Sequence, residues 1–379
     1  MERKPRGSRN LVPSQQPHII PPVPLEERQL ISQIRRLSVE RSHARGLGRA
    51  KRAVIAGIGD DCAVLRIPTG HEVLVTTDFS LEGVHFRRDW HSPSLIGHRC
   101  LTRGLSDIAA MGGEPRAVFL SLALPRRTPQ LWVDGFLHGL LKLAMQFNIP
   151  LAGGDTTQSP EGVLADVLVL GSVPKGRAIL RSGTRPGDRI YVTGALGAAA
   201  AETNFLYEKA DKSVQPSETG PQPRIAIGRF LRESQIATAM IDISDGLSTD
   251  LSHICEESSV GANIRADAIP RGRFRGQEVD LRLALHGGDA YELLFTARKR
   301  TQVPASIAGI RVAEIGEVVG GKAMTLIKAQ GRRSYLKPKV GNISDDISPG
   351  SKIFDAHPNK FLRSLITRAI LGQLPQPAI

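Results

Sequence analysis

Aspartates in short motifs with glycine, serine or threonine are the residues of this sequence whose types and spacing could do chemistry. The motifs are GIGDDCAVL, VTTDFSLEGVHF, GLSDIAAMGG, LAGGDTT and MIDISDG, and apolar residues flank each aspartate. The aspartates are Asp60, Asp61, Asp78, Asp107, Asp155, Asp242 and Asp245. A carboxylate held beside a hydrophobic core is costly unless it is paired, hydrogen-bonded or neutralised by a cation. The motifs therefore predict a cation site lined by carboxylates.

The ligand types indicate a hard divalent cation that faces phosphate groups. Oxygen ligands without neighbouring His or Cys select such cations, and magnesium keeps waters and substrate phosphates as its remaining partners. Further oxygen atoms are offered by Thr76, Thr77, Thr156 and Thr157. Phosphoryl transfer needs mainly positioning and charge neutralisation, which several magnesium ions and an arginine can supply. We predict a multi-magnesium site that faces a polyphosphate.

Each motif also has a structural interpretation, because aspartate beside glycine commonly forms a turn or a cap. Arg181, in GRAILRSG, is either a phosphate clamp or a partner in a surface salt bridge. His85 is either a ligand contact or an ordinary turn residue. The sequence has no G-x-x-x-x-G-K-[ST] loop, no H-R-D loop and no G-x-S-x-G elbow. These absences argue against a P-loop NTPase, a protein kinase and an α/β-hydrolase, respectively.

Length and composition predict two domains without a membrane span. The chain has 379 residues, of which 41% are hydrophobic, and no run of 18 apolar residues occurs. Cys62, Cys100 and Cys255 are far apart and form no CxxC pair, so neither a disulfide framework nor a thiolate zinc site is indicated. We expect a protein of the reducing cytoplasm.

The net charge of +13 is unevenly distributed. Residues 1–52 contain 12 Lys and Arg against 4 Asp and Glu, so they supply +8 and the remaining chain supplies +5. A basic segment can bind a polyanion, but no zinc finger or RNP-like stretch accompanies it, and aromatic residues make up only 4% of the chain. We predict a solvated extension and no nucleic-acid partner.

The order of apolar patterns predicts a mixed α/β or α+β fold. Helices are expected in LEERQLISQIRRL, in the segment that Ser94 caps and Gly112 ends, and in PQLWVDGFLHGLLKLAMQFN. Strands are expected in HEVLVTTD, AVFLSLALP and VLADVLVLGSV. A domain boundary is expected near Gly176–Gly187, followed by a second unit of strands and helices. The predicted divisions are 1–24, a disordered basic extension; 25–178; 179–357; and 358–379, a C-terminal tail.

Six motifs in this order resemble those of the thiamine-monophosphate kinases, a family of the aminoimidazole-ribonucleotide-synthetase-related superfamily. They are GIGDDCAVL, VTTDFSLEGVHF, LSDIAAMGGEP, LAGGDTT, GRAILRSG and DISDGLSTDL, and the resemblance runs from about residue 26 to about residue 357. It implies ATP-dependent phosphorylation of thiamine phosphate to thiamine diphosphate, by direct in-line transfer with several Mg²⁺ ions. It also implies two α/β domains, with residues 25–178 binding metal and ATP and forming a homodimer through a mixed sheet.

The resemblance implies a role for each matching residue. Metal ligands would be Asp61, Thr76, Thr77, Asp78, Asp107, Asp155, Asp242 and Asp245. ATP contacts would be Gly154, Asp155, Arg181 and Ser244. Among these, Asp78, Asp107 and Asp155 would gather the ATP phosphates, and Arg181 would offset the charge on the transferred group. His85 would contact thiamine phosphate.

Three departures from the family pattern bear on the substrate. GGDAYEL stands where the family has GGEDYEL, so Asp289 replaces a substrate-contacting Glu and Ala290 replaces the next acid. Gly104, beside Arg103, stands where Asn is common. The C-terminal motif is IFDAH, which makes Phe354 the residue expected to stack on the thiamine ring.

Two alternative functions follow from the same residues. One is another ATP-using enzyme of the superfamily, acting on a different small phosphorylated acceptor or on a carbonyl oxygen. The other is a non-catalytic protein that binds nucleotide or nucleic acid.

Overall fold

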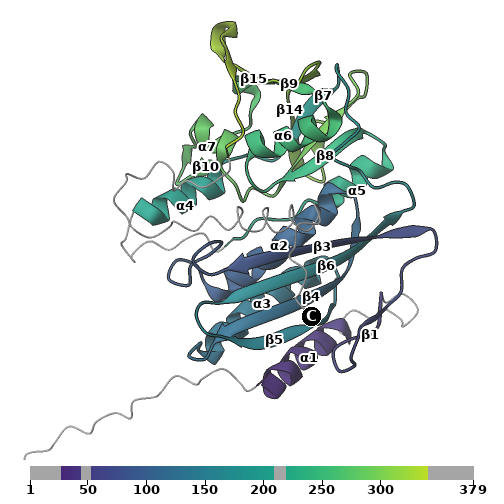
Figure 1. Cartoon of the computed structure of the whole chain (residues 1–379), viewed down its shortest axis with the longest axis vertical. Coiled ribbons are helices and arrows are strands. Elements are labelled where there is room, and N and C mark those ends of the chain that lie inside the picture. The colour runs from purple at the N-terminus through teal and green to yellow at the C-terminus, as the bar shows by residue number, and fades with distance from the viewer. Residues whose placement is uncertain (1–26, 44–52, 209–218, 340–379) are drawn as a thin grey trace, which may run out of the picture. The chain divides into compact units, whose positions relative to one another are not determined.

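The first part of the chain forms a four-stranded mixed sheet. A computed structural model describes residues 27–43, 53–208 and 219–339. The strands are β3 (His71–Leu81), β4 (Glu114–Pro125), β5 (Leu151–Ser159) and β6 (Leu164–Pro174). Their order is β3-β6-β4-β5; β4 and β5 run parallel and the other neighbours antiparallel (Figure 1). A small hairpin of β1 (Val54–Ala56) and β2 (Val64–Leu65) precedes this sheet.

Helices α2 (Pro93–Ala110) and α3 (Gln130–Gln146) cover one face of this sheet, and α1 (Glu27–His43) packs beside β5 and α3 (Figure 1). The alternating residues Ala165, Val167 and Val169 of β6 are fully buried toward the helices. The opposite face has no covering helix in the described part of the chain. Its β3 residues Val73, Val75 and Phe79 are between 49% and 62% exposed.

The second sheet is larger and has the order β16-β15-β9-β14-β7-β12-β8, with β13 beside β14. Its strands are β7 (Arg189–Thr193), β8 (Ala237–Ile243), β9 (Gly261–Arg265), β12 (Glu292–Ala297), β13 (Ser306–Ile307), β14 (Ile310–Val319), β15 (Met324–Ile327) and β16 (Arg333–Tyr335). Its helices are α4 (Ala198–Glu208), α5 (Ile225–Glu233), α6 (Leu247–Ser258) and α7 (Leu281–His286). The pair β10 (Arg273–Phe274) and β11 (Gln277–Glu278) forms a separate hairpin, and η2 (Ala266–Ala268) and η3 (Ala329–Gly331) are short 3₁₀ turns. The predicted mixed α/β architecture is confirmed.

Helix α2 is buried on most of its circumference. It contacts β3 and β6 on one side and α5, β8 and β12 of the second sheet on the other. Leu101 and Leu105 have no exposed surface, and Cys100 is 1% exposed. Burial raises the pKa of the Cys100 thiol to about 11, and Cys255 is also buried, whereas Cys62 is exposed. No helix in the described ranges is long and apolar enough to cross a membrane.

Two details of the predicted elements are wrong. The predicted cap of α2 was Ser94, but Ser92 accepts the hydrogen bond from the Leu95 amide at 3.2 Å. Pro93 then takes the first helical position, which its fixed φ suits. The LAGGDTT motif, for which a turn or cap was the structural interpretation, lies instead within strand β5, because parallel pairing with β4 extends through Ser159. The predicted boundary at 178/179 falls between β6 and β7, and the division into domains stays a prediction.

The contact between α2 and α3 depends on glycine. A Cβ atom at Gly139 would overlap the Ser94 carbonyl, and one at Gly97 would overlap the Phe136 carbonyl. We expect Gly139→Ala to lower the free energy of unfolding by ~1–3 kcal/mol, because the helices must separate to admit one methyl group. The neighbouring exposed His138→Ala should change it by less than about 0.5 kcal/mol. Chemical denaturation measures both, and equal values for the two variants would contradict this account.

Candidate active site

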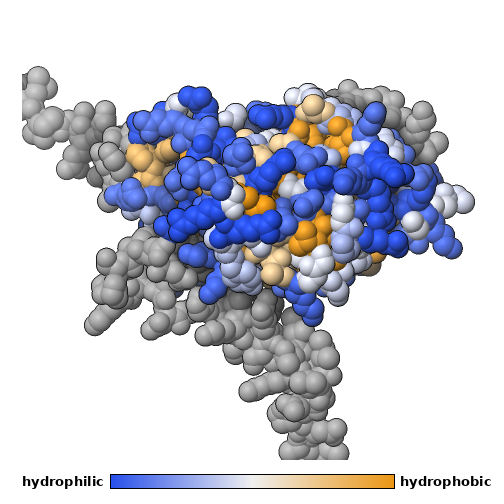
Figure 2. Space-filling view, turned by 90° about the horizontal axis from the view of Figure 1, so that it is seen from above, coloured by the Kyte–Doolittle hydropathy of each residue, from blue (hydrophilic) through white to orange (hydrophobic). Residues whose placement is uncertain are grey.

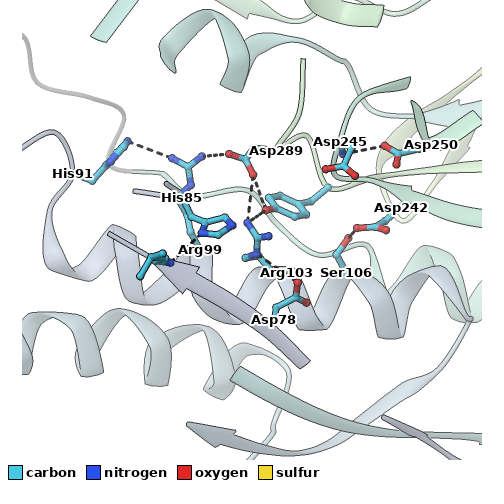
Figure 3. A network of polar contacts seen from close by, with 12 residues as sticks. Asp78, His85, His91, Arg99, Arg103, Ser106, Asp242, Asp245, Asp250 and Asp289 are labelled. Atoms are coloured by element: carbon cyan, nitrogen blue, oxygen red, sulfur yellow. Dashed lines mark hydrogen bonds and ion pairs between the residues drawn. The ribbon is translucent and has the colours of Figure 1, made fainter. Parts of the chain in front are cut away.

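One face of α2 carries the polar residues of the candidate site. Arg99, Arg103, Ser106 and Asp107 are spaced by four, three and one residues, which places them along one side of a helix. Figure 3 shows the first three of them on α2. Because α2 lies between the two sheets, this side faces β3, an edge strand of the first sheet, and β8, an edge strand of the second. Residues far apart in sequence therefore meet along one helix.

Three aspartates form what we call the carboxylate cluster: Asp78 from β3, Asp107 from α2 and Asp242 from β8. The Thr76 hydroxyl donates a hydrogen bond to Asp107. The Ser106 hydroxyl donates to Asp242 at 2.7 Å, where both residues are buried. These bonds connect α2 to β3 of the first sheet and to β8 of the second sheet.

Asp107 destabilises the ionised forms of the other two carboxylates of this cluster. Burial and repulsion by Asp107 raise the pKa of Asp78 to about 6, against the attraction of Arg103. Burial and Asp107 also raise the pKa of Asp242 to about 7. Burial raises the pKa of Asp107 as well, although its accepted hydrogen bond and nearby arginines favour the ionised form. Desolvated like charges of this kind are relieved by a bound cation.

A second group, the arginine network, adjoins the cluster. Arg99 donates to Asp289 at 3.0 Å, and the Tyr291 hydroxyl donates to the same carboxylate at 2.7 Å (Figure 3). Arg103 lies between the two groups, with its Nε 3.7 Å from Asp78 and its Nη1 4.0 Å from Asp289. Burial opposes the ionisation of Asp289, but these arginines and Tyr291 outweigh it and lower its pKa.

Two histidines border the arginine network. The Leu81 amide donates to His85 Nδ1 at 3.0 Å, and His91 lies 3.3 Å from Arg99. Desolvation and the charge of Arg103 lower the pKa of His85 to about 4, although part of the residue remains exposed. Desolvation and Arg99 lower that of His91 to about 4. Both rings are therefore neutral at neutral pH.

A third polar group lies at the start of α6. Asp245, Asp250 and His253 offer ligand atoms that lie within 4.8 Å of one another. Asp250 accepts from the amides of Asp245 and Gly246 at 3.1 and 3.0 Å. Burial and repulsion by Asp245 and Asp242 raise the pKa of Asp250 to about 8. Ser244, which precedes this group, accepts the Asp289 amide at 2.8 Å through its carbonyl oxygen.

Other predicted site residues lie on the open face of the first sheet or at its far edge. Thr77 donates to Asp166 at 2.5 Å on the open face, where Asp155 also points, since Phe79, Asp166, Ser121 and Asp155 are paired across the strands. Asp155 and Gly154 belong to β5, three strand spacings, or about 14 Å, from β3. The structure therefore does not bring Asp155 to the carboxylate cluster within one chain.

Asp61 is exposed near the same β5 edge. The segment before it packs on β5, where Gly57 approaches the carbonyl of Ala152. Arg181, between the two sheets, is exposed, and its charge moderates the rise in the pKa of Asp107 that burial causes. Phe354 lies outside the described residues.

Several polar residues of the site were not predicted. Asp166 interrupts the apolar alternation of β6, which was a readable signal. Asp250 lies one turn into a helix that begins at glycine, where an acid commonly binds free amides. Tyr291 had no sequence signal, because its contact with Asp289 depends on backbone φ values of +51° and +61° at these residues.

The arrangement suits a ligand with both metal and phosphate groups. Carboxylates with raised pKa values and threonine oxygens offer a hard-cation site, and guanidinium groups next to them offer donors to oxyanions. A separate cavity of about 530 Å³, lined by residues that include Lys328, Tyr335 and Lys339, shares no residue with this site.

Comparison with known proteins assigns the chain to a family. Residues 59–173 match the N-terminal domain of AIR synthase related proteins, and residues 185–328 match the C-terminal domain. Thiamine-monophosphate kinase of Salmonella typhimurium is 40% identical over 254 residues, which cover 64% of this chain and 76% of that protein. The chain belongs to the AIR synthase related family, in its thiamine-monophosphate kinase group.

Solved structures of the thiamine-monophosphate kinase group agree with this assignment. The enzyme from Stenotrophomonas maltophilia is 32% identical, with a TM-score of 0.68 over 80% of this chain and 96% of that one. A structure of AaThiL complexed with AMPPCP and TMP is 28% identical, with a TM-score of 0.61 over 73% of this chain and 91% of that one.

The pH dependence of stability tests the electrostatics of the cluster. The Asp242 carboxyl has an ordinary pKa of 3.8 and a folded value of about 7. Between these values the folded protein holds a proton that the unfolded chain has released, so Asp242 lowers the free energy of unfolding progressively as the pH rises from about 4 to about 7. Asp242→Asn keeps an acceptor for Ser106 and removes the charge. We expect the variant to exceed the wild type in unfolding free energy by roughly 2–4 kcal/mol at pH 8 without divalent cations.

The difference should shrink toward zero as the pH falls to about 4, because the wild-type carboxyl is then protonated in the folded state and increasingly protonated in the unfolded state. Urea denaturation of both proteins between pH 4 and pH 8 measures it. A difference that is constant with pH would contradict the raised pKa. The lowered pKa values of His85 and His91 change stability with pH in the opposite direction. Because the wild type and the variant share both histidines, these contributions cancel in the difference.

Proposed function

We propose that this chain phosphorylates thiamine phosphate to thiamine diphosphate with ATP, by direct in-line transfer. The observation that carries the proposal is the meeting of Asp78, Asp107 and Asp242 beside a network of arginines, in a chain 40% identical to thiamine-monophosphate kinase. AaThiL, a relative in the same group, has been solved with AMPPCP and TMP. Both reactants are anionic, so the site has to neutralise charge as well as orient them.

The carboxylate cluster fits magnesium. Its ligands are all oxygen atoms, and burial with mutual repulsion raises the pKa values of Asp78 and Asp242, as expected for carboxylates whose countercharge is a cation. Asp78, Asp107 and Asp242, with Thr76, would hold the ion or ions, and Asp245 with Asp250 would hold a further one. Bound magnesium would neutralise charge on the ATP phosphates.

The chain's own side chains would do the remaining work. Arg181 is exposed and close enough to act on Asp107, so its guanidinium would offset charge on the transferred group. Ser244 and Gly154 would contact ATP. His85, neutral at physiological pH, and Asp289 would contact thiamine phosphate. The expected stacking of Phe354 on the thiamine ring and the cytoplasmic location stay predictions.

We also propose that the enzyme is a homodimer joined by the open face of the first sheet. Val75 and Phe79 on edge strand β3 are 62% and 59% exposed, and no helix in the described chain covers them. The face seen in Figure 2 is, by contrast, largely hydrophilic, with small separate hydrophobic patches. A partner sheet would cover the apolar residues and would bring the Asp155 and Asp61 of one subunit toward the other subunit.

An activity measurement tests the function. With ATP and Mg²⁺, the folded protein should convert thiamine phosphate to thiamine diphosphate, and chelation of Mg²⁺ should abolish turnover. Asp107→Asn should lower kcat by about 100-fold or more, because it removes a charge from the cluster. The matched control is Asp134→Asn on α3, whose side chain contacts only Gln33 and Gln130 among the described residues.

Failure of folded, magnesium-supplied protein to use thiamine phosphate would refute the proposal. Turnover of a different small phosphorylated acceptor in the same assay would instead support the alternative enzyme of the superfamily. Separation of products by chromatography distinguishes these outcomes.

Oligomeric state tests the proposed interface. Wild-type protein should have twice the chain mass of 41.0 kDa by light scattering. Val75→Asp should weaken the dimer by roughly tenfold or more, because a charge would be desolvated in an apolar contact. Leu131→Asp on α3, at an 80% exposed position away from the sheet, should leave the mass unchanged. A wild-type monomer at micromolar concentration would contradict the interface.

A further inference from the structure

Arg103 differs from Arg99, its neighbour one turn earlier on α2, in how few hydrogen bonds its guanidinium makes. A guanidinium has five N–H donors. Within the described chain, one of them has an acceptor within 3.5 Å, the Tyr291 hydroxyl at 3.4 Å. Its Nε is buried without a hydrogen-bond partner and lies 3.7 Å from Asp78. A buried, unsatisfied donor on a charged group is costly unless a ligand completes its bonding.

Neighbouring arginines show what a satisfied guanidinium looks like in this fold. Arg224 makes a two-pronged contact with Glu292 at 2.7 and 2.5 Å. Arg99 donates to Asp289 at 3.0 Å, and the Tyr291 hydroxyl donates to the same carboxylate. Because these contacts already satisfy Asp289, Arg103 at 4.0 Å adds a second cation that this acid does not require.

Arg103 lies between the two groups of residues that would bind the reactants. The groups that face it are Asp78, Asp289, Tyr291, His85 and Cys100, so it lies between the carboxylate cluster and the residues expected to contact thiamine phosphate. Its side chain is 23% exposed, which leaves a route for an anion to its outer nitrogens. If Asp78 binds a metal ion, the guanidinium loses its nearest anion and gains one in the substrate.

We propose that Arg103 binds the phosphate of the acceptor substrate and so makes the enzyme select phosphorylated over unphosphorylated thiamine. This inference rests on the proposed function, because it names a residue of the same site. A planar guanidinium can donate two parallel hydrogen bonds to phosphate oxygens. It would also reduce repulsion between two anionic reactants brought together for transfer. An uncharged acceptor would gain nothing from this contact.

Binding of two ligands that differ by one phosphate tests the inference. Thiamine phosphate and thiamine are titrated calorimetrically into protein with Mg²⁺ and a non-hydrolysable ATP analogue. Arg103→Gln should weaken thiamine phosphate binding by about 10- to 100-fold, the range expected for a lost charge-assisted contact, and should change thiamine binding by less than about twofold. In turnover, the same variant should raise KM for thiamine phosphate more than KM for ATP.

Two further variants separate the assignment from effects on folding. Arg103→Lys keeps the charge beside Asp78 without the planar fork, so it should fold and give an intermediate loss of thiamine phosphate affinity. Arg116→Gln is the matched control: its side chain is also 23% exposed, and its partners Glu114 and Ser172 lie in the first sheet away from the site. It should bind both ligands as the wild type does.

Equal weakening of both ligands, or no weakening of either, would overturn the assignment. If the wild type turns over thiamine phosphate and Arg103→Gln binds it with unchanged affinity, Arg103 does not bind the substrate, and the proposed function still stands. If the wild-type protein binds neither ligand, both the assignment of Arg103 and the proposed function are wrong. Loss confined to thiamine phosphate supports Arg103 even if the transfer step is slow.

Discussion

Helix α2 is largely buried between two sheets, and most of the polar side chains on its inner side therefore have partners inside the protein. Its apolar residues satisfy the packing, with Leu101 and Leu105 fully enclosed. The remaining side brings Arg103 and Asp107 into a region of low solvent access, where charges interact strongly and cost energy if unpaired. The contacts of α2 with β3, β8 and the Asp289 segment follow from this requirement.

The carboxylate cluster and the arginine network each carry an excess of one sign of charge. On one side, carboxylates outnumber cations and hold protons more tightly than usual, as the raised pKa values of Asp78 and Asp242 show. On the other side, two guanidiniums share Asp289. A single ligand that carries metal ions at one end and a phosphate at the other would correct both. Such a ligand would also stabilise the folded protein, because it supplies the missing charges.

Much of the fold and part of the site were predictable from the sequence. Period-two and helical patterns gave the strands and helices of the first sheet, and the motif order indicated the family. The pattern did not reveal which carboxylates meet. Asp78 and Thr77 are adjacent, yet alternate strand positions point to opposite faces, so only Asp78 joins the cluster. The distance of Asp155 from the cluster depends on the β3-β6-β4-β5 strand order, which is a long-range property of the fold. The contact of Asp289 with Tyr291 depends on left-handed backbone conformations at both residues, which their side-chain types do not indicate.

The distribution of the cysteines has a practical consequence. Cys100 lies in the middle of α2 and Cys255 in α6, both enclosed by packing, whereas Cys62 follows Asp61 on the surface. A thiol reagent that reacts only with accessible groups would modify the native protein at one position. A fluorophore attached there would lie close to the segment that packs on β5. Because Asp61 is the adjacent residue, such a label would report the approach of a second subunit or a nucleotide to this edge.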